Sequence, residues 1–198
     1  TTMAFMLRGF DPILAVTLAP ADAFELWQIP LFILLGVLCG LMAWYFTSMN
    51  SRVGGFFKSI DKQYKKWLWG GAILGILIFV FPPLYGEGYE GFTSLMHGNA
   101  QELFNNSLFY RFRDIDWVII LFVIATMFFK VIAMSTTNAA GGVGGTFAPS
   151  LFVGAFTGAS LALVCNTLFG WEVSIVSFTL VGMAGVMSGV MNAPLTSI

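Results

Sequence analysis

Long uncharged, mostly apolar runs alternate with short polar segments along this chain of 198 residues. No Asp, Glu, Lys or Arg occurs in residues 26–51, 67–81, 117–129 or 131–171. A helix needs about 20 apolar residues to cross a hydrocarbon core about 30 Å thick. The pattern therefore predicts an all-α, polytopic membrane protein with helices over residues 26–51, 67–81, 117–135, 149–168 and 173–190.

The longest of these runs, residues 131–171, is about twice as long as one crossing requires. In its middle lies the stretch Gly-Gly-Val-Gly-Gly-Thr-Phe-Ala-Pro at 141–149, which we expect to separate two helices. Non-helical backbone at membrane depth is tolerated only where it is buried in protein or lines a watery cavity, because unpaired amides are costly in hydrocarbon. This stretch is therefore the first candidate for a functional site.

The residues after the glycines predict the start of a helix. Pro149 fits the first turn, where the amide hydrogen that it lacks would have no partner. The amides of Thr146, Phe147 and Ala148 would then be free and, with the positive end of the helix dipole, would suit an anion. No Arg or Lys lies between residues 141 and 171, so backbone amides and dipoles would hold the ion, weakly enough for its release.

Residues 145–149, Gly-Thr-Phe-Ala-Pro, resemble the G-x-F-x-P signature of the CLC family of chloride channels and proton-coupled chloride antiporters. The preceding Gly-Gly-Val-Gly-Gly matches the glycine-rich lead-in of that family. Downstream, Gly-Met-Ala-Gly at 182–185 and Asn-Ala-Pro-Leu-Thr at 192–196 are similar to its G-x-x-G and A-P-L-T elements. The resemblance covers nearly all of the chain and only the second half of the family's membrane domain.

The resemblance implies a CLC-like helical bundle with broken helices, which forms half of an inverted repeat. We expect residues 1–198 to be a partial transmembrane domain of this type, truncated at both ends. The implied function is transport of chloride or a similar small anion, in a homodimer, with Gly145, Thr146, Phe147, Ala148 and Pro149 as the anion site. The gating glutamates belong to motifs outside the chain, so channel and antiporter, and chloride, fluoride and nitrate, stay open.

Composition supports a multi-pass membrane protein, which we place in a plasma or inner membrane. Hydrophobic residues make up 58% of the chain and charged residues 10%, against roughly 25% charged in soluble proteins. The formal net charge of −1 argues against nucleic-acid binding and against a polybasic lipid-binding role. Cys39 and Cys165 stand alone in apolar runs, so we interpret them as buried hydrophobic residues. We expect no catalytic residue, cofactor or metal.

More than half of the nine cationic residues gather between the first two predicted helices. They are Arg52, Lys58, Lys62, Lys65 and Lys66. Such a cluster is typical of a cytoplasmic loop, and the Pro-Pro pair at 82–83 would end the second helix on the external side. Gly-x-x-x-Gly pairs at 36/40, 71/75, 154/158 and 185/189 mark faces for close helix contact, which is ordinary in helix bundles.

Lys130 is the one charge inside a predicted membrane helix that is long and otherwise uncharged. It either faces the protein interior, as an anion-path residue, or extends toward an interface, and we give the two interpretations equal weight. We expect Lys130→Met to lower anion flux at low salt and to leave folding near normal. His97, in a short, partly inserted helix predicted at 92–104, is more readily a packing residue than a proton relay.

Two other functions compete with anion transport. One is a helix-break transporter for another substrate, and the other is a membrane scaffold without transport. A nucleotide-binding loop is disfavoured, because the glycines lack the Gly-Lys-Ser or Gly-Lys-Thr ending. If the amides of Thr146 and Phe147 hold the anion, as we expect, Thr146→Val should keep binding within about tenfold. Gly145→Val should impair it, by crowding the anion and by excluding a positive φ.

Overall fold

The computed structural model describes residues 26–86, 116–171 and 173–192, and all regular elements in these ranges are helices. They are η1 (Leu26–Gln28), α2 (Ile29–Lys58), α3 (Gln63–Val80), η2 (Pro82–Leu84), α5 (Asp116–Ala139), α6 (Phe147–Phe169) and α7 (Ile175–Met191). Three of them, α2, α5 and α6, are long and apolar enough to cross a membrane. The predicted all-α, multi-pass fold is confirmed.

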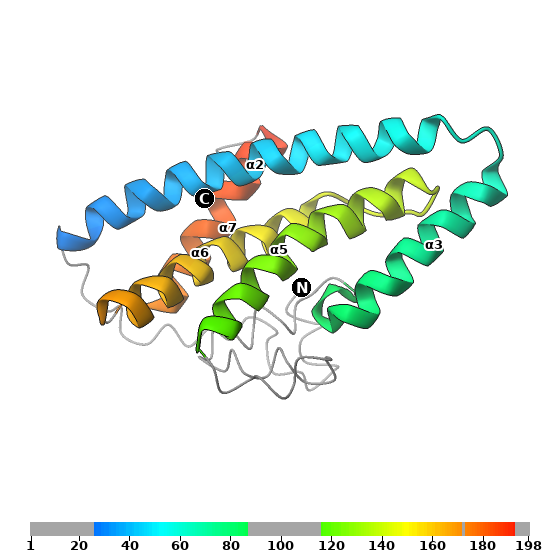
Figure 1. Cartoon of the computed structure of the whole chain (residues 1–198). Helices are drawn as coiled ribbons and strands as arrows, with labels where there is room; N and C mark the ends of the chain where they lie inside the picture. The colour runs from blue at the N-terminus through cyan, green and yellow to red at the C-terminus, as the bar shows by residue number, and fades with distance from the viewer. Residues whose placement is uncertain (1–25, 87–115, 172, 193–198) are drawn as a thin grey trace, which may run out of the picture.

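Helix α6 lies at the centre of this arrangement (Figure 1). It packs along α7 and α5, while α2 crosses α5, α6 and α7. Stacked rings fill the core: the centroids of Phe152 and Phe156 are 4.1 Å apart, and those of Phe32 and Phe178 are 4.6 Å apart. Helix α3 stands aside and contacts mainly α5 and η2.

Glycines allow α6 and α7 to touch through their backbones. A Cβ atom added at Gly158 would overlap the carbonyl oxygen of Phe178, and one added at Gly154 would overlap that of Gly182. Helices in a membrane gain little from hydrophobic burial against each other, so this close backbone contact is a main source of packing energy. The predicted small-residue face on α6 is thus confirmed.

The other glycine pairs differ from one another. Gly185 and Gly189 of α7 face α2. A Cβ added at Gly185 would lie 3.0 Å from the Cys39 Sγ, and one added at Gly189 would lie 2.7 Å from the Ala43 Cβ. The pairs on the first two predicted helices have nothing within 4 Å of an added Cβ among the described residues. They are Gly36, Gly40, Gly71 and Gly75. Cys39 is buried, as is Cys165, and both are free thiols, as interpreted from the sequence.

The predicted end of the first helix needs the largest correction. Helix α2 does not end near residue 51 but continues to Lys58, about 45 Å in all. The predicted basic loop is therefore mostly helical, with only residues 59–62 between α2 and α3. Arg and Lys are good helix formers and can extend a helix beyond the hydrocarbon. Helix α7, with 17 residues, is shorter than a full crossing, and His97 with the helix expected at 92–104 lies outside the described residues.

Candidate functional site

The glycine-rich break begins with a tight helix end. The Gly141 amide donates to the Asn138 carbonyl at 3.3 Å, and the Gly142 amide donates to the Thr137 carbonyl at 2.9 Å. This hydrogen-bond pair is the Schellman motif, which requires a left-handed residue, and Gly141 has φ 98°. The predicted break is therefore a capped helix end, in which the carbonyls of Thr137 and Asn138 are satisfied.

The next glycines fold back over the last turn of α5. A Cβ added at Gly142 would lie 2.9 Å from the Thr137 carbonyl oxygen, and one at Gly144 would lie 2.6 Å from the Asn138 Oδ1. Gly145 has more room, since the nearest atom to an added Cβ is the Phe147 nitrogen at 4.0 Å. Gly145 also lacks a positive φ, so the conformational part of our expectation for Gly145→Val is wrong.

Helix α6 starts with unsatisfied amides, as the sequence predicts. Thr146 is the N-cap and its side chain makes no capping hydrogen bond. The first backbone bond of the helix runs from the Ser150 amide to the Thr146 carbonyl at 3.1 Å. Pro149 has no amide hydrogen to offer, and the amides of Phe147 and Ala148 have no acceptor among the described residues. Two donors and the positive end of a 23-residue helix therefore face the break.

Lys130 lies in the protein interior, with 4% of its surface exposed. The interpretation that its side chain extends toward a membrane interface is therefore wrong. Its Nζ donates to the Leu84 carbonyl at 3.0 Å and to the Gly86 carbonyl at 2.8 Å, and lies 4.8 Å from the centroid of the Phe152 ring. The cation thus joins α5 to the turn after α3. This pairing gives Lys130 a structural contact that the expectation of near-normal folding for Lys130→Met did not take into account.

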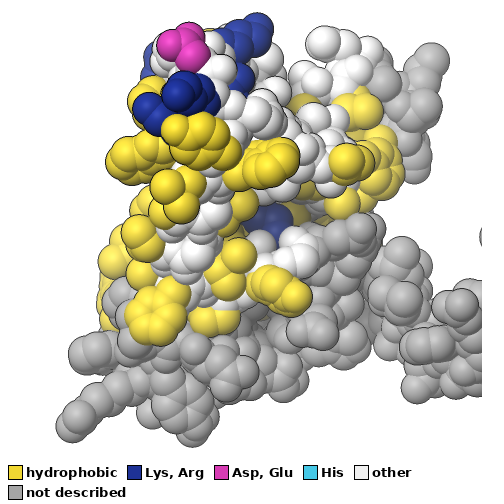
Figure 2. All heavy atoms as spheres, turned by 90° about the vertical axis from the view of Figure 1, so that its right-hand side faces the viewer, with side chains coloured by type: hydrophobic (Ala, Val, Ile, Leu, Met, Phe, Trp, Pro, Cys, Tyr) yellow, Lys and Arg dark blue, Asp and Glu magenta, His cyan; other side chains and the backbone are white. Residues whose placement is uncertain are grey.

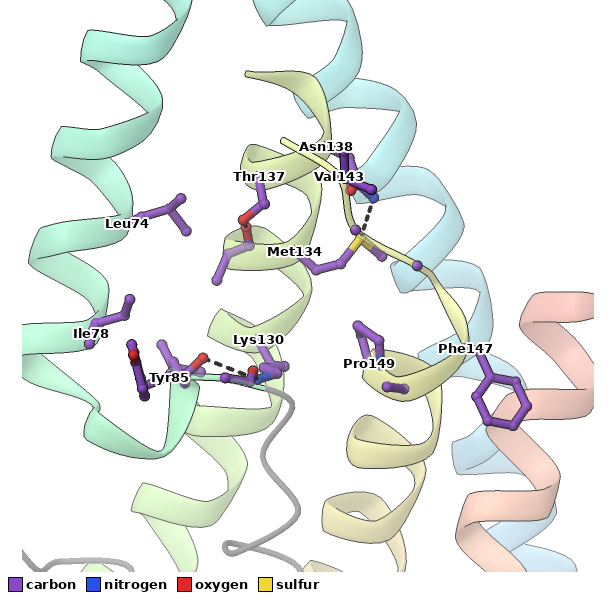
Figure 3. Close-up of a pocket in the computed structure, with 16 residues that line it drawn as sticks. Leu74, Ile78, Tyr85, Lys130, Met134, Thr137, Asn138, Val143, Phe147 and Pro149 are labelled. Carbon is purple, nitrogen blue, oxygen red and sulfur yellow. Dashed lines mark hydrogen bonds between the residues drawn. The ribbon is translucent and has the colours of Figure 1, made fainter. Parts of the chain in front are cut away.

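A cavity of about 600 Å³ brings these groups together (Figure 3). Its walls come from α3 and the turn after it (Leu74, Ile78, Leu84, Tyr85, Gly86), α5 (Lys130, Ala133, Met134, Thr137, Asn138), the break (Val143, Gly144, Gly145) and the start of α6 (Phe147, Ala148, Pro149). The close-up places Lys130 on one side and the start of α6 on the other. A single cavity therefore holds a buried cation and a free helix N-terminus.

Of the predicted site residues, Gly145, Phe147, Ala148, Pro149 and Lys130 all line this cavity. Thr146 does not line it, and its hydroxyl contacts the Met191 Sδ at 3.6 Å, at the end of α7.

Asn138 is a cavity residue that our sequence analysis did not identify. Its Nδ2 contacts the Met134 Sδ at 3.2 Å, while its buried Oδ1 has no hydrogen-bond partner in the described structure. An amide side chain has nearly the same shape when its oxygen and nitrogen change places. Rotation of the Asn138 amide by half a turn would therefore direct its N–H groups toward Gly144. A polar residue one turn before the glycines was the only available signal.

The chain matches a family model described as voltage gated chloride channel, over residues 1–198. Among curated relatives, it is 30% identical to the chloride channel protein CLC-e of Arabidopsis thaliana over 86% of this chain and 24% of the relative. It is 30% identical to CLC-f of the same plant over 93% of this chain and 23% of the relative. It is 29% identical to the H(+)/Cl(−) exchange transporter ClcA of Salmonella typhi over 98% of this chain and 38% of the relative.

The chain thus spans about a quarter to two fifths of the length of these relatives. No solved structure matches it.

Proposed function

The chain belongs to the family of voltage gated chloride channels, and from this premise we propose that its protein transports chloride or a similar small anion across a membrane. The finer proposal is that the anion binds in the cavity between α5 and α6, where the amides of Phe147 and Ala148 are its main ligands. The single observation that carries this proposal is the pair of unsatisfied amides at the start of α6, facing a cavity.

The surroundings of these amides favour an anion over a cation. The positive end of the α6 dipole and the charge of Lys130 both raise the electrostatic potential in the cavity. No Asp or Glu is among the described residues that line it. Leu74, Ile78 and Met134 form apolar walls, which lower the local dielectric constant and strengthen each of these interactions. A small monovalent anion suits a site with one cation.

The same arrangement favours release. The Lys130 ammonium already donates to two carbonyl oxygens, so it acts on an anion through the field more than through a direct bond. Backbone amides are neutral donors, and hydrogen bonds from neutral donors are weaker than those from charged ones. The site therefore binds an ion without trapping it, as conduction requires.

A helix-break transporter for another substrate and a scaffold without transport are the alternatives. Anion-dependent flux distinguishes either transporter from a scaffold. Competition by halides distinguishes a chloride transporter from a transporter for another substrate. The homodimer implied by the family resemblance belongs to this proposal, and light scattering of the purified protein tests it.

Flux from liposomes tests the transport proposal. The protein, expressed at its full natural length, is reconstituted in chloride-loaded vesicles, and efflux is followed with a chloride electrode. We expect efflux above that of empty vesicles, competition by external bromide, and none by gluconate. Efflux equal to that of empty vesicles contradicts transport, and efflux that halides do not affect favours another substrate.

A further inference from the structure

The end of the molecule where α2 meets α3 is strongly basic. Five cations lie there within 15 residues, Arg52, Lys58, Lys62, Lys65 and Lys66, and we call this part the α2–α3 corner. Asp61 is the only acidic residue in residues 26–86. Figure 2 shows most of the dark blue side chains gathered at one end of the face that carries α3, beside one magenta acidic group and with hydrophobic side chains directly beneath. The net charge of −1 for the whole chain conceals this local excess, which corrects our argument from composition.

Within the described residues, no acidic side chain pairs with these cations. None of the five cations forms an ion pair within the described ranges, although Asp61 is their neighbour in the chain. Lys62 instead lies 5.9 Å from the centroid of the Tyr64 ring. Four of the five are exposed and Lys66 is partly exposed. A concentrated, unpaired positive charge requires an anionic partner or salt for its neutralisation.

One buried side chain, Phe57, joins the two helices near the corner. Phe57, 1% exposed, packs toward Gly70 at the start of α3, where an added Cβ would lie 3.8 Å from the ring and 2.5 Å from the Ala140 Cβ. Phe57 therefore anchors the end of α2, which carries Arg52 and Lys58, against the rest of the bundle. A preorganised surface binds its partner with less loss of conformational entropy than a free loop does.

Aromatic side chains surround the base of the corner. Phe56, Tyr64, Trp67 and Trp69 are all exposed, each by more than half of its surface. Trp and Tyr with Lys or Arg beside them are typical of the level of lipid headgroups at the end of a membrane helix, and α2 is such a helix. An acidic soluble protein would complement the charge of the cations, but it would not account for the exposed aromatic side chains beside them.

We propose that the α2–α3 corner is a binding surface for the headgroups of anionic phospholipids, with the lysines and Arg52 contacting phosphate and Trp67 and Trp69 inserted at the level of the glycerol backbone. Gln63 and Trp67 also reach the glycine break, since a Cβ at Gly141 would lie 2.8 Å from the Gln63 Nε2 and 3.4 Å from the Trp67 Nε1. The proposed lipid surface therefore lies next to the break.

Tryptophan quenching by brominated lipid tests this surface without reference to transport. The protein at its full natural length is placed in nanodiscs of phosphatidylcholine with a minority of phosphatidylglycerol, with bromine on the chains of one lipid or of the other. We expect phosphatidylglycerol to be enriched about threefold or more over its bulk fraction next to the tryptophans. The enrichment should fall when salt rises from about 0.05 M to about 0.5 M.

Matched variants assign the enrichment to the corner. The fourfold change Lys58→Gln, Lys62→Gln, Lys65→Gln and Lys66→Gln should remove it, whereas the four Lys→Arg changes should retain it. Trp67→Phe with Trp69→Phe should remove the preference for phosphatidylglycerol from the quenching while the protein stays folded, because the other four tryptophans of the chain lie away from the corner. Equal quenching by both lipids in the unaltered protein overturns the proposal, as does enrichment that survives the four Lys→Gln changes. A purified acidic protein that binds in detergent and displaces phosphatidylglycerol also overturns it.

Discussion

Two adjacent glycines of the break have different surroundings, although the sequence pattern treats them alike. A Cβ at Gly144 meets the Asn138 Oδ1 at 2.6 Å, whereas a Cβ at Gly145 has no atom nearer than the Phe147 nitrogen at 4.0 Å. The first glycine is therefore required by packing. The second leaves open the space in front of the free amides, where an anion would lie.

This difference separates folding from binding. Gly144→Ala should lower the melting temperature, because one methyl group forced into a packed site costs about 1–3 kcal/mol. Gly145→Ala should leave the melting temperature unchanged and weaken chloride binding several-fold by crowding the ion. Thermal unfolding and calorimetric chloride titration of both variants are the measurement. Equal effects on stability would contradict the assignment.

Lys130 makes hydrogen bonds to a distant turn that could not be predicted from the sequence. Its carbonyl partners are 44 and 46 residues away in the chain, and no local pattern reports such a contact. Lys130→Met leaves the Leu84 and Gly86 carbonyls without this donor and should lower stability by about 1–3 kcal/mol. Chloride flux should fall as well, most at low salt.

Lys130→Arg provides the control, because it keeps the charge and changes the geometry of the donors. It should retain the salt dependence of flux. Unfolding curves and flux at two salt concentrations decide between the roles: a Lys130→Met variant with unchanged stability would show that the two hydrogen bonds contribute nothing to the fold.

Helix pairing depends on which glycines face a neighbour. Gly158→Ala places a methyl group against the Phe178 carbonyl, and backbone cannot move aside as a flexible side chain can. We expect a loss of at least about 3 kcal/mol, or no folded protein. Gly75→Ala is the matched control, since nothing lies within 4 Å of its added methyl group. Fluorescence-detected gel filtration after heating compares the two, and similar melting points would contradict the close α6–α7 contact.

Much of the element pattern could be predicted from the sequence, because proline, glycine and charge mark helix ends. Helix α3 ends at Val80 before Pro82, and α6 begins at Phe147 after the glycines. The end of α2 could not be placed, since Arg52 and Lys58 signal the membrane boundary while the helix continues beyond it. The partners of the glycine pairs were also hidden, because a small-residue pair specifies a close contact without naming the facing helix.

At the scale of the whole molecule, the basic α2–α3 corner predicts the orientation in the membrane. A cysteine at Ser59 should react with an impermeant maleimide from the cytoplasmic side, and one at Tyr85, beside the Pro-Pro turn, from outside. Gly86 is a less suitable position for the external cysteine than Tyr85, because its φ of 64° disfavours a side chain. Cys39 and Cys165 are buried and should not react. External labelling of Ser59→Cys would reverse the predicted topology.

The proposed anion site has two walls that come from parts of the chain far apart in sequence. The free amides of α6 could be predicted from Pro149 and the glycines, whereas the opposite wall, with Leu74 and Ile78 of α3, could not. Helix α3 is apolar on every side after its first turn, so periodicity does not reveal which face packs on α5. Only the folded chain shows that Asn138 and Lys130 share one cavity with the break.

Replacing a single backbone amide by an ester tests the central claim most directly, because it removes one N–H donor and leaves every side chain in place. An ester at Phe147 or Ala148, introduced by semisynthesis into the full-length protein, should weaken chloride binding by at least tenfold in calorimetry, about 1.4 kcal/mol. An ester at Val143, an exposed residue of the same break, and the side-chain change Thr146→Val should both leave binding within that limit. Unchanged affinity with the esters at Phe147 and Ala148, or loss of binding with Thr146→Val alone, would contradict an anion held by the amides of α6.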